Sequence, residues 1–305
     1  MENEVDKVEE EIVGIKKMEK TANINQEWTT IIEPKTKLFS IDFREIWQYR
    51  DLIRMFIRRN FNVMYKQTIL GPLWFVIQPV LTVVMYMVVF GNIAQISTDG
   101  IPQPLFYLSG ITIWGYFASC FGSCANALVG NASIFSKVYF PRLCSPISSL
   151  ISALLPFGIN MLIFLVTYGY YCVFTDAVIN ITWGVLLFPI IVILVALMGA
   201  GIGLFLSSIT TKYRDLSIFI SFAFRLWMYA TPIIYPLSTI DNEHLRIVMY
   251  LNPMTGLVEF FKWSFLGVGS HEWWLLGYSV AFCIIMLVLG VVVFNRAQRT
   301  FMDTV

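Results

Sequence analysis

Long apolar stretches separated by short polar connections occupy the chain from residue 71 onward. A bilayer core about 30 Å thick requires roughly 20 apolar residues in a helix. Six stretches meet this requirement: residues 73–90, 105–129, 143–174, 183–208, 216–235 and 273–294. The pattern therefore predicts an all-α membrane protein with six transmembrane helices. The first helix starts at Gly71-Pro72, because proline is well tolerated in the first turn of a helix.

A different periodicity precedes the first apolar stretch. From residue 42 to residue 66, apolar side chains such as Trp47 and Phe56 fall on one side of a helix and cations such as Arg44 and Arg58 fall on the other. This spacing predicts an amphipathic helix at the cytoplasmic membrane interface, within residues 41–70. An ordinary surface helix would instead need a soluble core to pack on, and none follows in the sequence.

The segment between the fifth and sixth stretches contains two short apolar runs that are separated by Asn252-Pro253. Each run is too short to span, and the proline breaks the helix between them. The pattern predicts a re-entrant helical hairpin that enters the outer leaflet and returns. The alternative is a helical external loop that lies flat. Glu259 and Lys262 are three residues apart and can pair, which lowers the cost of partial burial.

Composition and charge support a membrane protein. Hydrophobic residues make up 57% of the 305 residues and charged residues only 13%, against about 25% charged residues in a soluble domain. Lys137, Arg142, Lys212 and Arg214 follow the second and fourth stretches, whereas the opposite connections, 91–104 and 175–182, carry no cation. Positive charge marks cytoplasmic loops, so both termini are expected to be cytoplasmic.

The two ends of the chain complete the predicted division. Twelve of the 21 Lys and Arg and twelve of the 20 Asp and Glu fall within the first 66 residues. Residues 1–40 are predicted to form a charged cytoplasmic extension, 71–296 a six-span transmembrane domain and 297–305 a cytoplasmic tail. The first apolar stretch starts too late to be a cleavable leader.

The sequence offers little for catalysis. No Asp or Glu lies within the core of the six stretches, and both His residues fall in the segment before the last one, so no catalytic residue is predicted. No phosphate-binding P-loop motif is present, so uphill transport would need energy from another protein. Cys120 and Cys124 are four residues apart, but no His is near them; buried packing is favoured over a metal site.

Several polar and aromatic residues within the stretches are candidates for a transport path. Arg225 lies near the middle of the fifth stretch, where an isolated Arg costs about 2.5–3.5 kcal/mol. It is expected to face a polar path or a partner, or else to reach the interface or backbone carbonyls. Gln78 is a milder polar feature of the first stretch. The aromatic candidates are Trp74, Tyr86, Trp227, Tyr229 and Tyr235. They either anchor helices at the membrane interface or stack on sugar rings.

Two predictions concern contacts between helices and with other proteins. Gly199 and Gly203 are four residues apart and predict close helix packing. Two cytoplasmic turns combine aromatic and charged residues, and they serve either as topology anchors or as docking surfaces. The first contains Phe135, Lys137, Tyr139, Phe140 and Arg142, and the second contains Tyr213, Arg214 and Asp215.

Five motifs in series carry a family resemblance. They are YKQTILGPLWFVIQP, SIFSKVYFPR, TKYRDL, LWMYATPIIYP and LNPMTGLVEFFKWSFLG. Over residues 40–295 the chain resembles the transmembrane permease of type-2 ABC exporters, in the branch that moves lipid-linked polysaccharides, O antigens and teichoic acids. The extension before residue 40 exceeds the usual family pattern.

The resemblance implies an assembly and roles for particular residues. Two copies of the permease would form a homodimer in the bacterial inner membrane, among its lipids, with two ABC ATPase subunits that bind ATP and Mg²⁺. The first and fifth spans would line the path, the two cytoplasmic turns would dock the ATPase, and Asn252, Pro253, Glu259 and Lys262 would form an external gate. Family members often carry a neutral polar residue where this chain has Arg225.

The predicted function is that of an exporter subunit for a lipid-linked glycan, without catalytic activity or a cofactor of its own and without a nucleic-acid partner. An exporter for a small amphiphile or lipid is the first alternative. A membrane-embedded glycosyl- or acyltransferase is the second, and it would depend on acidic residues at the membrane surface such as Asp42, Asp51 and Asp215.

Overall fold

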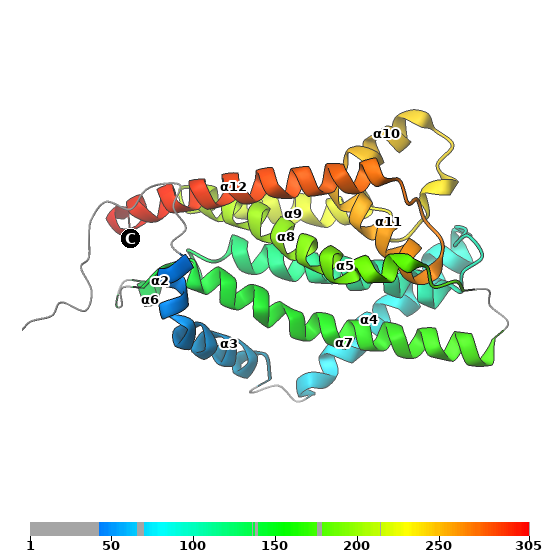
Figure 1. Ribbon diagram of the computed structural model, residues 1–305, viewed down its shortest axis with the longest axis horizontal. Coiled ribbons are helices and arrows are strands. Elements are labelled where there is room, and N and C mark those ends of the chain that lie inside the picture. The colour runs from blue at the N-terminus through cyan, green and yellow to red at the C-terminus, as the bar shows by residue number, and fades with distance from the viewer. Residues whose placement is uncertain are drawn as a thin grey trace, which may run out of the picture. The chain divides into compact units, whose positions relative to one another are not determined.

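The computed structural model describes residues 43–65, 70–135, 137, 140–175, 179–213 and 215–304, and the regular elements of this part are all helical (Figure 1). The first half contains α2 (Phe43–Gln48), α3 (Arg50–Tyr65), η1 (Gly71–Leu73), α4 (Trp74–Tyr86), η2 (Met87–Ile93), α5 (Gln103–Ala125), α6 (Ala132–Phe135) and α7 (Cys144–Phe174). The second half contains η3 (Trp183–Leu187), α8 (Phe188–Thr210), α9 (Leu216–Tyr229), η4 (Leu237–Thr239), α10 (Glu243–Leu251), α11 (Pro253–Leu266) and α12 (Trp273–Thr304). The predicted extension, residues 1–40, lies outside the described residues.

Five helical segments are long and apolar enough to cross a membrane. They are Trp74–Ile93, Gln103–Ala125, Cys144–Phe174, Trp183–Thr210 and Trp273–Gln298. Each corresponds to one of the stretches that the sequence predicts. The helical class and five of the six expected spans are therefore confirmed by length and composition.

The remaining predicted span is shorter as a helix than the sequence indicates. The apolar stretch runs to residue 235, but α9 contains 14 residues and ends at Tyr229, which gives about 21 Å of helix. Pro232 follows, and a proline lacks the N–H that would continue the helix. Beyond it, Ile233 lies so close to Gly110 of α5 that a Cβ on the glycine would be 2.7 Å from the isoleucine side chain. The expected helix end was wrong because this tight packing requires irregular backbone.

The predicted amphipathic helix is divided in two. A turn at Tyr49 separates α2 from α3. Phe56 of α3 is buried, whereas Trp47 of α2 is exposed. The prediction of a single continuous helix over residues 42–66 was therefore wrong. The apolar face that the sequence predicts is buried at Phe56 but not at Trp47.

The segment before α12 contains the two helices that the sequence predicts. α10 and α11 are separated at Asn252, and Pro253 is the first residue of α11. Every residue of α11 except Trp263 is buried, whereas α10 contains no buried residue. The two helices of the predicted hairpin thus differ in burial, because α11 packs against α5, α8 and α12.

Small residues set the packing at the centre of the protein, where α8 lies between α5 and α12 (Figure 1). A Cβ added at Gly199 or Gly203 of α8 would lie 2.9 or 2.7 Å from the Cβ of Cys120 or Cys124 of α5, respectively. Gly201 faces the backbone of α12 instead. The close packing predicted at Gly199 and Gly203 is confirmed, and Cys120 and Cys124 are buried.

The contact between α8 and α12 supports a stability prediction. A Cβ at Gly290 would lie 2.2 Å from the backbone oxygen of Gly201, whereas a Cβ at Gly277 of the same helix would meet nothing within 4 Å. Gly290→Ala is expected to force the two helices apart and to lower the free energy of unfolding by about 1–3 kcal/mol. Gly277→Ala is the matched control and should be neutral or stabilising. Thermal unfolding of both purified variants measures the difference, and equal stability would contradict the packing account.

Candidate functional site

α9 presents two different faces to its surroundings. On its inner face, the Phe224 ring stacks on Phe121 of α5 with centroids 4.2 Å apart. The Trp227 ring lies nearly perpendicular to the rings of Trp114 and Phe117 of α5, in T-shaped contacts. The predicted path residue Trp227 is therefore half-buried against α5, and its place in a transport path stays a prediction.

The outer face of α9 contains a polar stripe, which we define as Ser217, Ser221, Arg225 and Tyr229. These residues are four positions apart and all are exposed. The neighbouring stripe is apolar and consists of Ile218, Phe222 and Leu226, also exposed. The two stripes divide the uncovered face of α9 into a polar and an apolar edge, and Arg225 and Tyr229 are the predicted path residues on the polar one.

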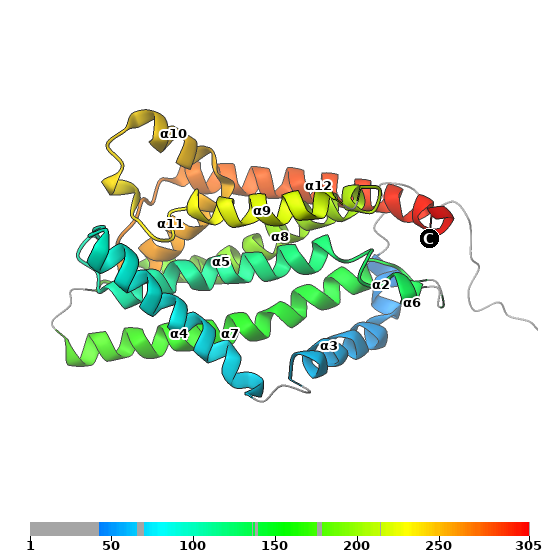
Figure 2. The ribbon, with the colours of Figure 1, turned by 180° about the vertical axis from the view of Figure 1, so that it is seen from behind.

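α4 approaches α9 only at one end. The Tyr86 hydroxyl lies 3.8 Å from the Met228 sulfur, whereas the two helices diverge toward the start of α4 (Figure 2). Trp74 and Gln78 lie on this diverging part and are exposed. The structure therefore brings Tyr86 to α9 but does not bring Trp74 or Gln78 there.

Asn252 connects the end of α9 to the helical hairpin. Its Oδ1 accepts hydrogen bonds from Trp227 Nε1 at 2.9 Å and from the Met254 backbone N–H at 3.0 Å. Its Nδ2 donates to the Ala230 carbonyl and to Thr231 Oγ1, both at 2.9 Å. All four interactions join three segments at one buried amide, which fixes the position of α11 relative to α9.

Tyr235 makes a second connection, between the end of α9 and α10. Its hydroxyl donates to the backbone carbonyl of Tyr229 at 2.9 Å and lies 3.2 Å from the sulfur of Met249 in α10. The predicted path residue Tyr235 therefore has its polar group engaged within the protein.

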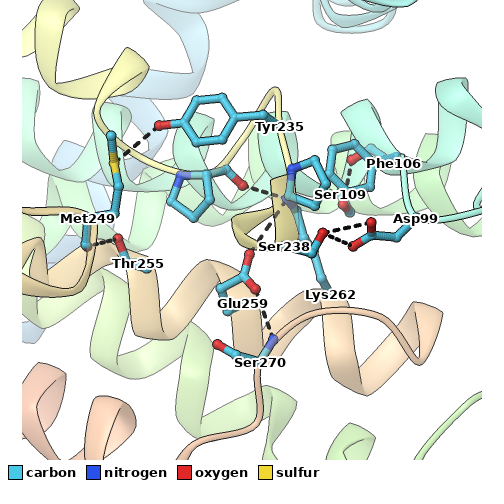
Figure 3. Close-up of polar contacts among 12 residues, drawn as sticks. Asp99, Phe106, Ser109, Tyr235, Ser238, Met249, Thr255, Glu259, Lys262 and Ser270 are labelled. Atoms are coloured by element: carbon cyan, nitrogen blue, oxygen red, sulfur yellow. Dashed lines mark hydrogen bonds and ion pairs between the residues drawn. The ribbon is translucent and has the colours of Figure 1, made fainter. Parts of the chain in front are cut away.

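The ion pair predicted from spacing is fully buried (Figure 3). Lys262 Nζ lies 3.9 Å from Glu259 Oε1, and both side chains are 1% exposed. Lys262 also donates a hydrogen bond to the Pro232 carbonyl and lies 3.9 Å from the ring centroid of Phe106. Glu259 Oε2 accepts from the Ser270 backbone N–H at 2.9 Å.

The electrostatics of this pair follow from its burial. Burial lowers the pKa of Lys262 and raises the pKa of Glu259, while the attraction between their charges opposes both shifts. Nearby, Ser238 donates to the Asp99 carboxylate, with its Oγ 2.8 and 2.9 Å from the two oxygens (Figure 3). The predicted gate residues Glu259 and Lys262 thus hold α11 against the Pro232 segment.

The first predicted docking turn is only partly available to a partner. Phe135 and Phe140 are 4% and 5% exposed. The Phe140 ring packs between Phe135 and Phe56 of α3, with centroids 5.4 and 5.5 Å apart. A docking surface would need exposed aromatics, whereas both rings are buried and Phe56 of α3 packs on Phe140. Arg142 lies over the Phe135 ring and donates to the Gln298 carbonyl of α12.

Other predicted docking residues are exposed. They are Lys137 in the first turn and Tyr213 and Asp215 in the second. Tyr139 and Arg214 lie outside the described residues. In the second turn, Lys212 Nζ lies 5.3 Å from the Tyr213 ring centroid.

The sequence did not predict the network of polar side chains that joins α3 to its neighbours. Arg59 donates to Asn131 Oδ1 at 3.2 Å, and Asn60 donates to Ser152 Oγ of α7 at 3.3 Å. Asn131 in turn donates to Ser145 Oγ at 2.9 Å. The partners are 72 and 92 positions apart in the first two contacts, and no local pattern marks them. The network joins α3 to α7 and to the segment that carries the first turn.

The described residues show no metal centre. No three His, Cys, Asp or Glu side chains gather there in a metal-binding arrangement. The resulting class is a multi-pass helical membrane protein with an uncovered polar and aromatic helix face and exposed charged turns at one end.

Comparison with known proteins identifies the family. Residues 51–266 match the family model described as ABC-2 type transporter, so the chain belongs to this family. It is 31% identical over 224 residues to the O-antigen export system permease protein RfbA of Myxococcus xanthus, covering 72% of this chain and 82% of that protein.

More distant similarity extends further along the chain. RfbA of Klebsiella pneumoniae is 28% identical over 257 residues, covering 83% of this chain and 94% of that protein. The polysialic acid transport protein KpsM of Escherichia coli is 20% identical over 254 residues, covering 81% and 93%. The resemblance to ABC exporter permeases predicted from the motifs is confirmed.

Proposed function

We propose that the chain is the membrane subunit of an ATP-driven exporter that moves a lipid-linked polysaccharide across the bacterial inner membrane. The observation that carries this proposal is the similarity to O-antigen export permeases over more than four-fifths of their length. ATP and Mg²⁺ bind to a separate ATPase subunit, and the permease acts as a homodimer with two such subunits.

The topology that completes the proposal has six crossings. α9 and the irregular segment after it form the fifth crossing, which is supported by the burial of Thr231, Ile233 and Ile234. Both termini are cytoplasmic, α2 and α3 lie at the inner interface, and α11 re-enters the outer leaflet. Residues 71–296 form the permease domain and 297–305 the cytoplasmic tail.

In this proposal, different helices form the transport path and the external gate. The outer faces of α4 and α9 border the path, and the polar stripe of α9 supplies groups that a glycan can contact. The hydrogen bonds of Asn252 and the buried pair hold α11 near the outer end of α9. Movement of α9 therefore changes the position of the hairpin, which opens or closes the exit.

An export assay tests the proposed function. A bacterial host that synthesises a lipid-linked O-antigen but lacks its own exporter receives this permease together with its candidate ATPase. Flow cytometry with an antibody then measures the glycan at the cell surface. We expect surface glycan only when both proteins are present. Export of a fluorescent lipid without any glycan export would replace the proposal with that of an amphiphile exporter.

The docking role of the cytoplasmic turns gives a separate prediction. The double substitution Lys137→Ala/Asp215→Ala removes one exposed charge from each turn and is expected to lower the affinity for the ATPase subunit by at least about tenfold. Microscale thermophoresis with the purified ATPase measures the affinity of each permease variant. His244→Ala in exposed α10, distant from the turns in Figure 1, is the control. Unchanged affinity in the double variant would remove these turns from the docking surface.

A further inference from the structure

Within one copy of the chain, the polar stripe of α9 contains a charge that no described residue compensates. Arg225 is exposed, and within the described part of the chain it forms no hydrogen bond or ion pair. The nearest acidic residue along the chain is Asp215, which directly precedes α9, about 15 Å away along the helix axis. Asp99 and Glu259, toward the other end, are engaged by Ser238 and by Ser270 with Lys262.

The position of Arg225 makes exposure to lipid costly. It lies nine residues after Leu216, the first residue of α9, about 13 Å along the helix, and thus near the middle of a bilayer core about 30 Å thick. An Arg at that depth costs about 2.5–3.5 kcal/mol on the mildest scale. The apolar stripe of Ile218, Phe222 and Leu226 suits lipid or a packed surface, whereas the stripe with Arg225 requires a polar environment.

The groups beside Arg225 favour an oxyanion as its occupant. A guanidinium presents several N–H donors in a planar fork that fits two oxygens of a phosphate or carboxylate. Tyr229, one turn further along the stripe, offers an exposed hydroxyl. One turn earlier, the Ser221 hydroxyl donates to its own helix at the Ser217 carbonyl, 2.7 Å away. The strongest available donors on the stripe are therefore Arg225 and Tyr229.

We propose that Arg225 contacts an oxyanion of the cargo and selects for anionic cargo during export. This inference rests on the proposed function and specifies its substrate class. The oxyanion is either the phosphate of the lipid carrier or an acidic group on the sugar chain, and both have the same chemistry toward a guanidinium.

Two glycans and two substitutions test the proposal. The glycans are built on the same lipid diphosphate, one with neutral sugars and one with acidic sugars. Arg225→Gln removes the charge, and Arg225→Lys retains it without the fork. Export per permease molecule is measured at the cell surface after the membrane level of each variant is determined. Phe222→Ala, on the neighbouring apolar stripe, controls for general effects on α9.

Arg225→Gln is expected to lower export by about tenfold, as the loss of one charge-assisted hydrogen bond would. Arg225→Lys retains the charge, so its loss of export should be smaller. Loss with both glycans identifies the lipid phosphate, and loss with only the acidic glycan identifies the sugar acid. Equal export by all variants, or an equal loss in both Arg225 variants, would overturn the inference. Failure of the unaltered protein to export either glycan would contradict the proposed function itself.

Discussion

Lys262→Met is expected to lower the free energy of unfolding by about 3–5 kcal/mol, because it leaves Glu259 as an uncompensated buried charge. Glu259 Oε1 has no hydrogen-bond partner, and its neighbouring cation is Lys262 at 3.9 Å. The same substitution also removes the hydrogen bond to the Pro232 carbonyl and the contact with the Phe106 ring. Thermal or denaturant unfolding of the purified permease in detergent measures the loss.

Two further variants separate the ion pair from general effects of substitution. Glu259→Gln/Lys262→Met removes both charges and should recover much of the stability, since replacing a buried pair entirely is often neutral. Arg54→Met breaks the Arg54–Asp51 pair, which has the same three-residue spacing but side chains that are 72% and 78% exposed, so its cost should stay below about 1 kcal/mol. A double variant as unstable as Lys262→Met would show that lost packing, not the charge, dominates.

Phe140→Ala is expected to have an effect of similar size. Truncation of a buried Phe costs about 3–5 kcal/mol, and the Phe140 ring joins the first predicted docking turn to Phe56 of α3. We therefore expect lower stability of the permease together with weaker transmission of ATPase movement into α3. The two readouts are thermal unfolding of the permease and glycan export at equal membrane level.

The controls for Phe140 use the same region of the protein. Phe140→Leu retains most of the apolar volume and should cost clearly less than alanine. Met55→Ala changes the exposed neighbour of Phe56 on the same helix and should leave stability nearly unchanged. A Phe140→Ala variant with unaltered unfolding and unaltered export would show that the contact with Phe56 has no role in either property.

Local sequence patterns predicted the features that depend on local physics. Continuous apolar runs define five span-length helices, and the proline after Asn252 defines the break between α10 and α11. The spacing of Gly199 and Gly203 predicted close helix packing, and the structure shows that the helix packed there is α5. In each case the structure depends on a property of the residues themselves. The property is hydropathy for the apolar runs, the missing N–H for the proline and the missing side chain for the glycines.

Features that depend on distant partners could not be predicted in this way. The apolar run after Tyr229 has the composition of a helix, but its backbone is set by Pro232 and by packing of Ile233 on Gly110. Phe135 and Phe140 have the composition of an exposed aromatic turn, and only the position of α3 determines that they are buried. The role of the candidate path residues stays a prediction, and the geometry favours Arg225 and Tyr229 over Trp227.

The most direct test of the central claim is the ATPase activity of the purified permease assembled with its candidate ATPase subunit in lipid, with and without undecaprenyl-linked glycan. The account predicts a stable complex whose ATP hydrolysis is stimulated by the glycan, with no stimulation of the ATPase alone. A complex that forms but responds equally with and without the glycan, or a permease that does not bind the ATPase at all, would contradict it.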